Sequence, residues 1–545
     1  MTVTPLPSPD LPAGRPRLVV TGFMGTGKTE AGGRAALLLG LPFLDLDSLV
    51  EAAAGAPVAA VFAAEGEGGF RAREREAVAE SSRLSGLVVA TGGGAPLDDG
   101  YGVLADGAVA AVLTCHEDEL LGRLGGGAGR PLLGDDPPGR VRTLLRERAD
   151  AYARAGASLD TTGLPPDAVA GRLAERYRVS AGAGPARVEV RGPDGPYPVL
   201  VGPGAIGSLG EVISEALPGC RRTVIVADGG AAHIAISVAA ALAGAGFEVP
   251  EPLHVPAGEE AKTLEVLTGL WTRLRELEVE RGNLVVGVGG GAALDVAGFA
   301  AATFARGLPL VNVPTTVLAM ADAALGGKTA VDHDGVKNLA GVFHHPRAVV
   351  ADTETLSTLD ERTRRAGLGE VVKAAAIAAP AALDVLAAGP AGEALTAWGI
   401  EQAVRVKAAF VSEDPADTGV RRALNLGHTF AHAIESASGH RVPHGEAVAV
   451  GVVAAARLGR RLGLTPDGME ARLRGALASL GLPAAVADLP DAPQLGPDAL
   501  RRAMEADKKR SGGRHRFVVP IERGVALVEA DPAEAIAALL EEAPG

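Results

Sequence analysis

Lysine is scarce in this chain of 545 residues, in which 44 arginines accompany only eight lysines. Average usage of charged residues would give roughly thirty lysines at this length. A compact ammonium and a planar guanidinium are not interchangeable where a phosphate or a proton-transfer centre must be met. The few lysines are therefore candidates for chemistry: Lys28, Lys262, Lys328, Lys337, Lys373, Lys407, Lys508 and Lys509.

Other shortages exclude classes of function. Aromatic residues make up 3% of the chain, too few for the stacking platforms of single-strand nucleic-acid binders. A net charge of −14 also argues against nonspecific binding to DNA or anionic membranes. Cys115 and Cys220 form no disulfide or metal-cage pattern and suit a reducing compartment. We expect a cytoplasmic protein with neither nucleic-acid nor membrane partners, in which local basic pockets could still hold small anionic metabolites.

The length predicts about three domains, and 74 glycines with 47% hydrophobic residues favour closely packed α/β layers. Residues 1–17 are proline-rich, lack the apolar core of a signal peptide, and are predicted to be a disordered leader. A small-residue stretch at 180–187 predicts a linker. It separates a first domain over 18–179 from a second unit, and a cut near Gly184 is expected to leave both halves folded and active if each has its own core.

A P-loop lies near the start of the first domain. RLVVTGFMGTGKTEAGGRAALLLG reads as a strand, a glycine-rich turn and a helix, with Gly22, Gly27, Lys28 and Thr29 in the required pattern. Loop amides are expected to cradle phosphates, Lys28 to reach the β- and γ-phosphates, and Thr29 to hold Mg²⁺. The predicted ATP-binding residues of the loop are Gly25, Thr26, Gly27, Lys28 and Thr29.

Two carboxylates follow in LPFLDLDSLVE. Asp45 and Asp47 alternate at strand spacing, so they share one face only if the strand ends between them. One of them could serve Mg²⁺ and the other an acceptor hydroxyl. The segments GGFRARE, VVATGGGA, GRPLL and ERADAY come next in order.

In the order and spacing of these motifs, the first domain resembles shikimate kinase. The resemblance implies Mg²⁺ near Asp45 together with Thr29, and the shikimate hydroxyl on Asp47 as base or orienter. It further implies catalytic roles for Lys28 and Arg130. The remaining implied contacts are Arg71 and Arg148 on the shikimate carboxylate, Gly92, Gly93 and Gly94 lining the acceptor pocket, Arg130 reaching in from a mobile lid, and Arg123 near the adenine.

The second unit opens with β-rich sequence and then repeats a strand–loop–helix order twice. In NLVVGVGGGAALDVAGFAAATFARG, Gly289–Gly291 form a turn at a helix start, with Asp295 four residues on. Such a turn suits a pyrophosphate, although it is not the full dinucleotide fingerprint.

Histidines cluster later in the chain. His428 and His432 are four residues apart on one predicted helix face, His444 follows in PHGEA, and Glu370 stands in GLGEVVKAAAI. One glutamate with two or three histidines is good zinc chemistry that leaves a position open for a substrate oxygen.

The second unit resembles 3-dehydroquinate synthase over nearly its whole length. The motifs that carry the resemblance are GGGxxxD, MxDxxxGGKT, KN, GExxK, LNLGHTxxHAIE, HGE and DKK. It implies an α/β fold with a Rossmann-like NAD domain over 188–355, then a mostly helical metal- and substrate-binding domain over 356–545, behind the parallel-sheet P-loop kinase domain. Zn²⁺, or Co²⁺, would lie on Glu370, His428 and His444, with His432 a catalytic neighbour. A homodimer through this unit is also implied.

The resemblance also assigns contacts to NAD and to a sugar-phosphate acid. The NAD contacts are Asp228, Glu259, Lys262, Gly291, Asp295, Thr315, Thr316, Lys328, Lys337, Thr355 and Leu356. The contacts for 3-deoxy-arabino-heptulosonate 7-phosphate are Arg306, Asp322, Lys328, Asn338, Lys373, Lys407, Arg421, Asn425 and one of Lys508 and Lys509. Of these, Asp322, Lys328, Lys373, Lys407, Arg421 and Asn425 are expected to act in catalysis along with His432.

Three functions remain open at this point. The leading one is a bifunctional enzyme that phosphorylates shikimate and cyclises the heptulosonate. The second is another sugar-phosphate cyclase fused to another small-molecule kinase. The third makes the P-loop domain a regulatory nucleotide-binding module without turnover, and Asp45 and Asp47 argue against it.

Overall fold

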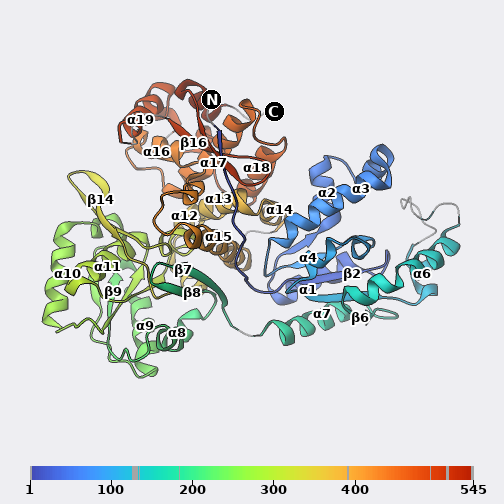
Figure 1. The fold of residues 1–545 in the computed structure, drawn as a ribbon, viewed down its shortest axis with the longest axis horizontal. Coiled ribbons are helices and arrows are strands. Elements are labelled where there is room, and N and C mark those ends of the chain that lie inside the picture. The colour runs from blue at the N-terminus through green and yellow to red at the C-terminus, as the bar shows by residue number, and fades with distance from the viewer. Residues whose placement is uncertain are drawn as a thin grey trace. The chain divides into compact units, whose positions relative to one another are not determined.

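The computed structural model describes residues 3–124, 133, 136–182, 184–389, 392–490, 492–510 and 515–541. The chain divides into two compact units, whose elements are labelled in Figure 1. The P-loop unit consists of Arg15–Ala183 and Ala379–Trp398. The large unit consists of Met1–Gly14, Gly184–Ala378 and Gly399–Gly545.

A five-stranded parallel sheet with strand order β3-β4-β2-β5-β6 forms the centre of the P-loop unit. Its strands are β2 (Leu18–Gly22), β3 (Phe43–Asp45), β4 (Val88–Ala90), β5 (Val109–Thr114) and β6 (Ala157–Asp160). Leu18 and Val20 pack against Ala35 of the first helix and Leu173 of the last. Strands covered on both faces read as continuous apolar runs, as β2 does.

Helices surround this sheet. They are α1 (Lys28–Leu39), α2 (Leu46–Ala54), α3 (Val58–Ser82), α4 (Tyr101–Ala105), α5 (Glu117–Leu124), α6 (Pro137–Ala155), α7 (Pro166–Ala181) and α14 (Ala381–Ala388). Helix α3 is kinked at Gly66, whose φ of 70° lies in the left-handed region that glycine adopts at little cost.

The large unit contains a seven-stranded sheet with strand order β10-β9-β11-β12-β15-β8-β7. The strands are β7 (Ala186–Gly192), β8 (Gly195–Gly202), β9 (Thr223–Asp228), β10 (Leu253–Val255), β11 (Leu284–Gly289), β12 (Leu310–Pro314) and β15 (Ala348–Asp352). All neighbours are parallel except the β7–β8 hairpin. Helices α8 (Leu209–Ala216), α9 (Ala232–Gly244), α10 (Leu264–Glu276) and α11 (Gly291–Thr303) connect them.

A hairpin and a helical region complete this unit. The hairpin is β13 (Lys328–His333) with β14 (Val336–Phe343). The helices are α12 (Glu361–Ala366), α13 (Leu368–Ala378), α15 (Glu393–Glu413), α16 (His428–Ala437), α17 (His444–Arg461), α18 (Met469–Ser479), α19 (Pro497–Arg510) and α20 (Pro532–Leu539). The start of α15, up to Trp398, belongs to the P-loop unit. Every residue of α13 is buried, so the charges of Glu370 and Lys373 are removed from bulk water.

The expected disordered leader is wrong for residues 3–6. Strand β1 (Val3–Leu6) pairs antiparallel with β17 (Val525–Glu529), which also pairs with β16 (Arg516–Pro520). Prolines suggested disorder, but Pro5 lies in an edge strand, where a missing backbone N–H is tolerated. The partner strand is at the other end of the chain, beyond the reach of a local pattern.

The P-loop unit breaks at Ala183, inside the expected 180–187 linker, but it also includes Ala379–Trp398, which the expected domain over 18–179 does not contain. Helix α7 ends at Ala181 and β7 begins at Ala186, within the expected linker. The expected boundary at 355–356 follows the last strand of the large sheet and stays a prediction. Among the described residues, no single helix has the length and apolarity of a membrane span, and only the bent pair α2 and α3 meets that test, by length and composition.

Candidate functional sites

The P-loop connects β2 to α1. A Cβ at Gly22 would lie 2.3 Å from the carbonyl oxygen of Leu113, so the close approach of β5 requires glycine. Gly27 adopts φ 86° as the N-cap of α1 and gives that helix no side-chain cap. The first amides of α1 are thus open to an anion, which the helix dipole also favours. The Lys28 Nζ donates to the Phe23 carbonyl at 3.0 Å.

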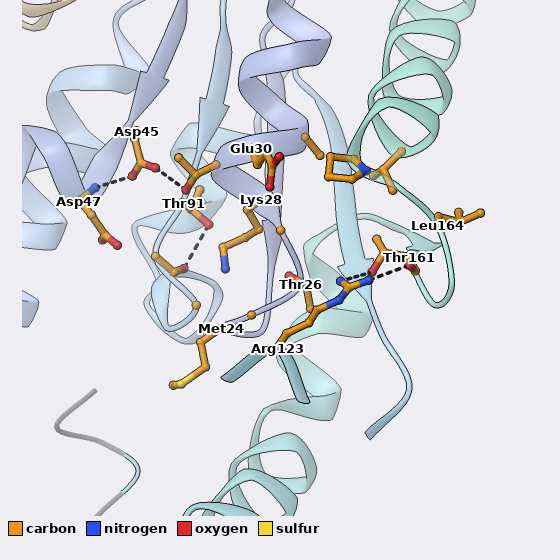
Figure 2. A pocket seen from close by; sticks show the side chains of 18 residues that line it. Met24, Thr26, Lys28, Glu30, Asp45, Asp47, Thr91, Arg123, Thr161 and Leu164 are labelled. Atoms are coloured by element: carbon orange, nitrogen blue, oxygen red, sulfur yellow. Dashed lines mark hydrogen bonds between the residues drawn. The ribbon is translucent and has the colours of Figure 1, made fainter. Parts of the chain in front are cut away.

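A cavity of about 680 Å³ opens in front of this loop. Figure 2 shows Asp45 and Asp47 on one side of Lys28, and Arg123 beside Thr161 on the other. Arg123 donates to the Thr161 carbonyl at 3.1 Å. The cavity is lined by residues of the predicted ATP site and by residues of the predicted acceptor site. The predicted lid residue Arg130 lies outside the described residues.

The two aspartates face the cavity because β3 ends at Asp45. The Asp45 carboxylate caps α2 by accepting from the amide of Asp47 at 3.0 Å. Its second oxygen accepts from the Thr29 hydroxyl at 2.6 Å. A hydroxyl and a carboxylate oxygen at the phosphate loop are hard oxygen donors, so these residues fit a Mg²⁺ ion carried by a nucleotide.

Asp47 has the electrostatics of a proton acceptor. Burial, with the negative charges of Asp45 and Glu74, raises its pKa to about 6. A base that titrates near the working pH is suited to proton transfer. Glu74 is buried, and its Oε1 has no hydrogen-bond partner. A Cβ at Gly92 would be 2.4 Å from that oxygen, so glycine is needed there.

Two guanidinium groups converge on the Gly92–Gly94 loop. Arg148 is buried and donates to the Gly93 carbonyl at 3.0 Å. Arg71 pairs with Glu74 at 2.5 Å, and a Cβ at Gly94 would be 2.1 Å from its Nη1. This geometry suits a small carboxylate, because guanidinium groups bind carboxylates in forked pairs.

Two residues near this loop had no role assigned from the sequence, although Glu74 stands in the motif GGFRARE. The Tyr152 hydroxyl donates to the Gly93 carbonyl at 2.6 Å, and Glu74 fixes Arg71. The three-residue spacing of Arg71 and Glu74 on a helix could have signalled their pairing.

The large unit has a phosphate-type turn where β11 meets α11. Gly289, at φ 150°, would place a Cβ 2.7 Å from that of Asp228. Helix α11 begins at Gly291 and has no side-chain cap, and the amide of Thr315 donates to the Gly289 carbonyl at 3.0 Å. Thr316 approaches the same turn. This cradle at the carboxyl ends of parallel strands fits a dinucleotide pyrophosphate.

Predicted NAD contacts also lie on α11, on β14 and in the turn before α10, and the predicted substrate contact Asn338 on β14 joins them. Lys262 is buried and lies 2.6 Å from Asp295, and it also donates to the side chain of Asn338. Burial raises the pKa of Asp295 to about 6 despite this lysine. Lys337 is 4.0 Å from Glu259. Thr355 and Leu356 are buried after β15, where the Thr355 hydroxyl donates to the Asp352 carbonyl.

Buried cations form a second group. Lys407 lies 2.7 Å from Asp322, and burial lowers its pKa to about 8. Burial opposes ionisation of Asp322, but Lys407 and Lys373 hold its pKa far below the ordinary range. Arg421 is also buried and donates to the Gly326 and Pro415 carbonyls at 3.1 Å each. Such a concentration of cations suits a substrate that carries several negative charges.

Glu370, His428 and His444 meet in a candidate metal centre, with one ligand atom of each within 4.8 Å of the others. The Oε1 of Glu370 is 3.6 Å from Nε2 of His428 and 3.3 Å from Nε2 of His444. This oxygen is buried without a hydrogen-bond partner, as expected of a ligand atom that serves a cation. Burial lowers the pKa of His428 to about 3, which leaves its imidazole neutral. The residues fit zinc or cobalt.

Neighbouring charges orient this centre. Burial disfavours ionised Glu370, but Lys373 helps to hold its pKa at about 2. Glu435, on α16, lies 3.3 Å from Nδ1 of His444 and was missed by the sequence analysis. Its place in HTxxHAIE was the available signal, because ligating histidines pair their second nitrogen with a carboxylate. The ring of His432 lies 5.7 Å from that of His428.

The remaining predicted residues of the large unit keep their roles as predictions. Arg306 and Asn425 are exposed. Lys328 pairs with Asp417 at 2.5 Å. The side chains of Lys508 and Lys509, at the end of α19, lie outside the described residues.

The two units thus combine a P-loop phosphotransferase site with an α/β cofactor cradle beside a Glu–His–His metal centre. The shikimate kinase family model matches residues 24–178. The models for the N-terminal and C-terminal parts of 3-dehydroquinate synthase match 252–366 and 367–510. The chain belongs to the 3-dehydroquinate synthase family and carries a shikimate kinase domain before it. It is therefore a bifunctional enzyme of the shikimate pathway.

Known proteins support this assignment. The chain is 42% identical over 341 residues to 3-dehydroquinate synthase of Nocardia farcinica. The matched region covers 62% of this chain and 89% of that protein. Among solved structures, a 2-deoxy-scyllo-inosose synthase complexed with carbaglucose-6-phosphate, NAD⁺ and Co²⁺ is 28% identical, with a TM-score of 0.57 and coverage of 65% and 99%. A 2-epi-5-epi-valiolone synthase from Streptomyces hygroscopicus, with NAD⁺ and Zn²⁺ bound, is 29% identical, with a TM-score of 0.55 and coverage of 63% and 95%.

Proposed function

We propose that the P-loop unit transfers the γ-phosphoryl group of ATP to shikimate, and that the large unit converts 3-deoxy-arabino-heptulosonate 7-phosphate to 3-dehydroquinate with release of phosphate. The observation that carries the proposal is the presence of two separate groups of chemically suited side chains in one chain. One is Lys28, Asp47 and Arg148 around a loop that can bind phosphates. The other is Glu370, His428 and His444 beside buried Lys407 and Arg421.

In the kinase reaction, the loop amides and Lys28 bind the phosphates, and Thr29 with Asp45 would hold Mg²⁺, which supplies charge neutralisation. Arg71 and Arg148 bind the shikimate carboxylate and thereby fix the ring. Asp47 accepts the proton of the acceptor hydroxyl, because its pKa of about 6 leaves it ionised at neutral pH yet basic. Positioning and electrostatics supply the remaining rate enhancement.

In the cyclase reaction, the glycine turn and Asp228 hold NAD, and Glu370, His428 and His444 would hold zinc. NAD and zinc when bound supply hydride transfer and polarisation of a substrate oxygen. Lys407 and Arg421 bind the phosphate and carboxylate and keep the substrate oriented. Lys373, Asp322 and His432 line the route for protons during oxidation, loss of phosphate and return of the hydride, after which ring opening and aldol closure form the carbocycle. Burial limits the access of water.

A second candidate is a cyclase for an uncarboxylated sugar phosphate. It is considered because the two similar solved structures are synthases of 2-deoxy-scyllo-inosose and 2-epi-5-epi-valiolone rather than of 3-dehydroquinate. Buried Arg421 favours a carboxylated substrate instead. The relatives that are 42% identical favour the same choice. The dimer through the large unit remains a prediction.

The purified chain tests the proposal directly. We expect ATP-dependent phosphorylation of shikimate and NAD-dependent release of phosphate from the heptulosonate, with glucose 6-phosphate as a poor substrate. The Glu370→Ala variant is expected to lose only the second activity, and Lys28→Met only the first. Turnover of glucose 6-phosphate in preference to the heptulosonate would favour the second candidate. Failure to phosphorylate shikimate while ATP still binds would favour a regulatory P-loop unit.

A further inference from the structure

The P-loop unit contains a segment from the second half of the sequence. Residues Ala379–Trp398 belong to it, although the residues before and after them belong to the large unit. Within the P-loop unit, α14 packs against α3. Trp398 is 4% exposed, and its indole N–H donates to the carbonyl oxygen of Ser85 at 2.7 Å. Ser85 is equally buried, so water does not replace this bond easily.

This segment touches helix α3 and the loop that leads from α3 into β4. Helix α3 bears Arg71 and Glu74 and ends at Ser82. Ser85 lies between α3 and β4, and β4 leads into Gly92–Gly94. The α14–Trp398 segment thus packs against the helix and the loop that precede the acceptor-side guanidinium and glycine groups, whereas the P-loop follows a different strand, β2.

The exchange is reciprocal. Met1–Gly14 precede the P-loop in sequence but belong to the large unit. Strand β1 completes the sheet of β16 and β17 there, with Val3 opposite Val528 and Leu6 opposite Val525. Farther along, the buried side chain of Arg405 donates from Nε to the Pro12 carbonyl at 2.8 Å. Each unit thus has a segment that the other half of the chain supplies.

We infer that these two exchanged segments hold the units together even without the 180–187 connection, and that the α14–Trp398 segment positions the acceptor side of the kinase site. The halves predicted from the linker are then not independent: a kinase cut out at Gly184 lacks its own α14 and Trp398. The part of this inference that concerns the acceptor rests on the proposed function, whereas the part that concerns association does not.

Association is tested in the full chain with a protease site inserted at the exposed Gly184. After complete cleavage, the two pieces are expected to co-elute in size-exclusion chromatography under native conditions. The same cleaved protein with residues 2–14 deleted and Trp398→Ala is expected to separate, because both exchanged segments are then weakened. Separation of the otherwise unaltered cleaved protein contradicts the inference. Co-elution of the doubly altered protein also contradicts it, because other surfaces would then hold the pieces.

Positioning is tested with Trp398→Phe, which keeps an aromatic ring but removes the N–H. The matched control is Trp271→Phe, since the chain has only two tryptophans and the Trp271 indole donates to Thr303 in the large unit at 3.1 Å. For Trp398→Phe we expect KM for shikimate to rise about three- to tenfold, the change set by one buried hydrogen bond. KM for ATP and the cyclase rate should stay at the control values.

An unchanged KM for shikimate in Trp398→Phe contradicts the positioning role, as does an equal rise in KM for ATP. Loss of cyclase activity in the same variant would show general damage and would also contradict it. If the unaltered chain does not phosphorylate shikimate at all, the proposed kinase function fails, while the cleavage experiment still decides whether the exchanged segments hold the units together.

Discussion

Replacing Asp47 by Asn should separate activity from stability in the P-loop unit. The ordinary pKa of 3.8 is raised to about 6, first by burial and then by the charges of Asp45 and Glu74. Because the folded-state pKa lies above the unfolded value, the carboxylate costs stability as pH rises from about 4 to 6, and the cost is complete above pH 6. This shift corresponds to ~3 kcal/mol of destabilisation.

The amide cannot accept a proton, so turnover should fall by about 10²- to 10⁴-fold, the usual contribution of a general base. ATP binding should persist because the P-loop is intact. The amide also removes the buried charge, so the melting temperature should stay the same or rise. In the unaltered chain, kcat/KM for shikimate should fall as pH drops through about 6, and the residual activity of the variant should lack this dependence.

The assay couples ADP formation to NADH oxidation at several pH values, with calorimetry on the same samples. Asp99→Asn is the matched control, because Asp99 is exposed and outside the cavity. Near-normal turnover in Asp47→Asn would refute the role of base. A loss of activity together with a lower melting temperature would also contradict this role, because Asp47 would then be needed for stability.

Three further outcomes concern the large unit. Arg421→Lys should raise KM for the heptulosonate about tenfold or more, because an ammonium cannot reproduce the forked geometry, and an unchanged KM would count against a carboxylated substrate. Glu435→Ala should weaken zinc binding about 10- to 100-fold in a competitive chelator titration. Glu435→Gln should weaken it much less, because the amide carbonyl still accepts from His444, and equal losses in the two variants would contradict the orienting role. The cyclase kcat/KM should fall as pH rises through about 8, the pKa at which Lys407 loses its charge. If a Lys407→Met variant showed the same fall in kcat/KM, the pH dependence would belong to another group.

Local patterns in the sequence predicted much of the fold and the site. The P-loop depends on a short strand–turn–helix, and its residues Gly27 and Lys28 are contiguous in sequence. The spacing of Asp45 and Asp47 did not decide whether both face the same side. In the structure both line the cavity, because β3 ends at Asp45. The helical spacing of His428 and His432 fits a shared metal, but the fold brings Glu370 and His444 to His428. Spacing alone cannot make that choice; the family resemblance implied it, and tertiary packing is its physical cause.

Other features depend on partners far away in sequence. Strand β1 forms because β17 offers an edge, which no pattern in the first residues reveals. The alanine-rich α14 would suit any buried face, so its sequence does not say which core it joins. Ser85 and Trp398 meet through a backbone carbonyl, and such contacts leave no mark on residue types. Glu74 and Glu435 were assigned no role because a carboxylate that orients another side chain resembles an ordinary surface charge.

Two separate chemistries in one chain should respond differently to the loss of zinc. One sample of the full chain is assayed for shikimate phosphorylation in excess Mg²⁺ and for heptulosonate cyclisation, before and after treatment with a zinc-selective chelator. We expect the cyclase activity to disappear and to return with Zn²⁺ or Co²⁺ but not with Mg²⁺, since Glu370, His428 and His444 offer the ligands of a transition metal. The kinase activity should be unchanged. Loss of both activities together would contradict two separate chemistries, and cyclisation that survives complete removal of zinc would contradict the metal centre.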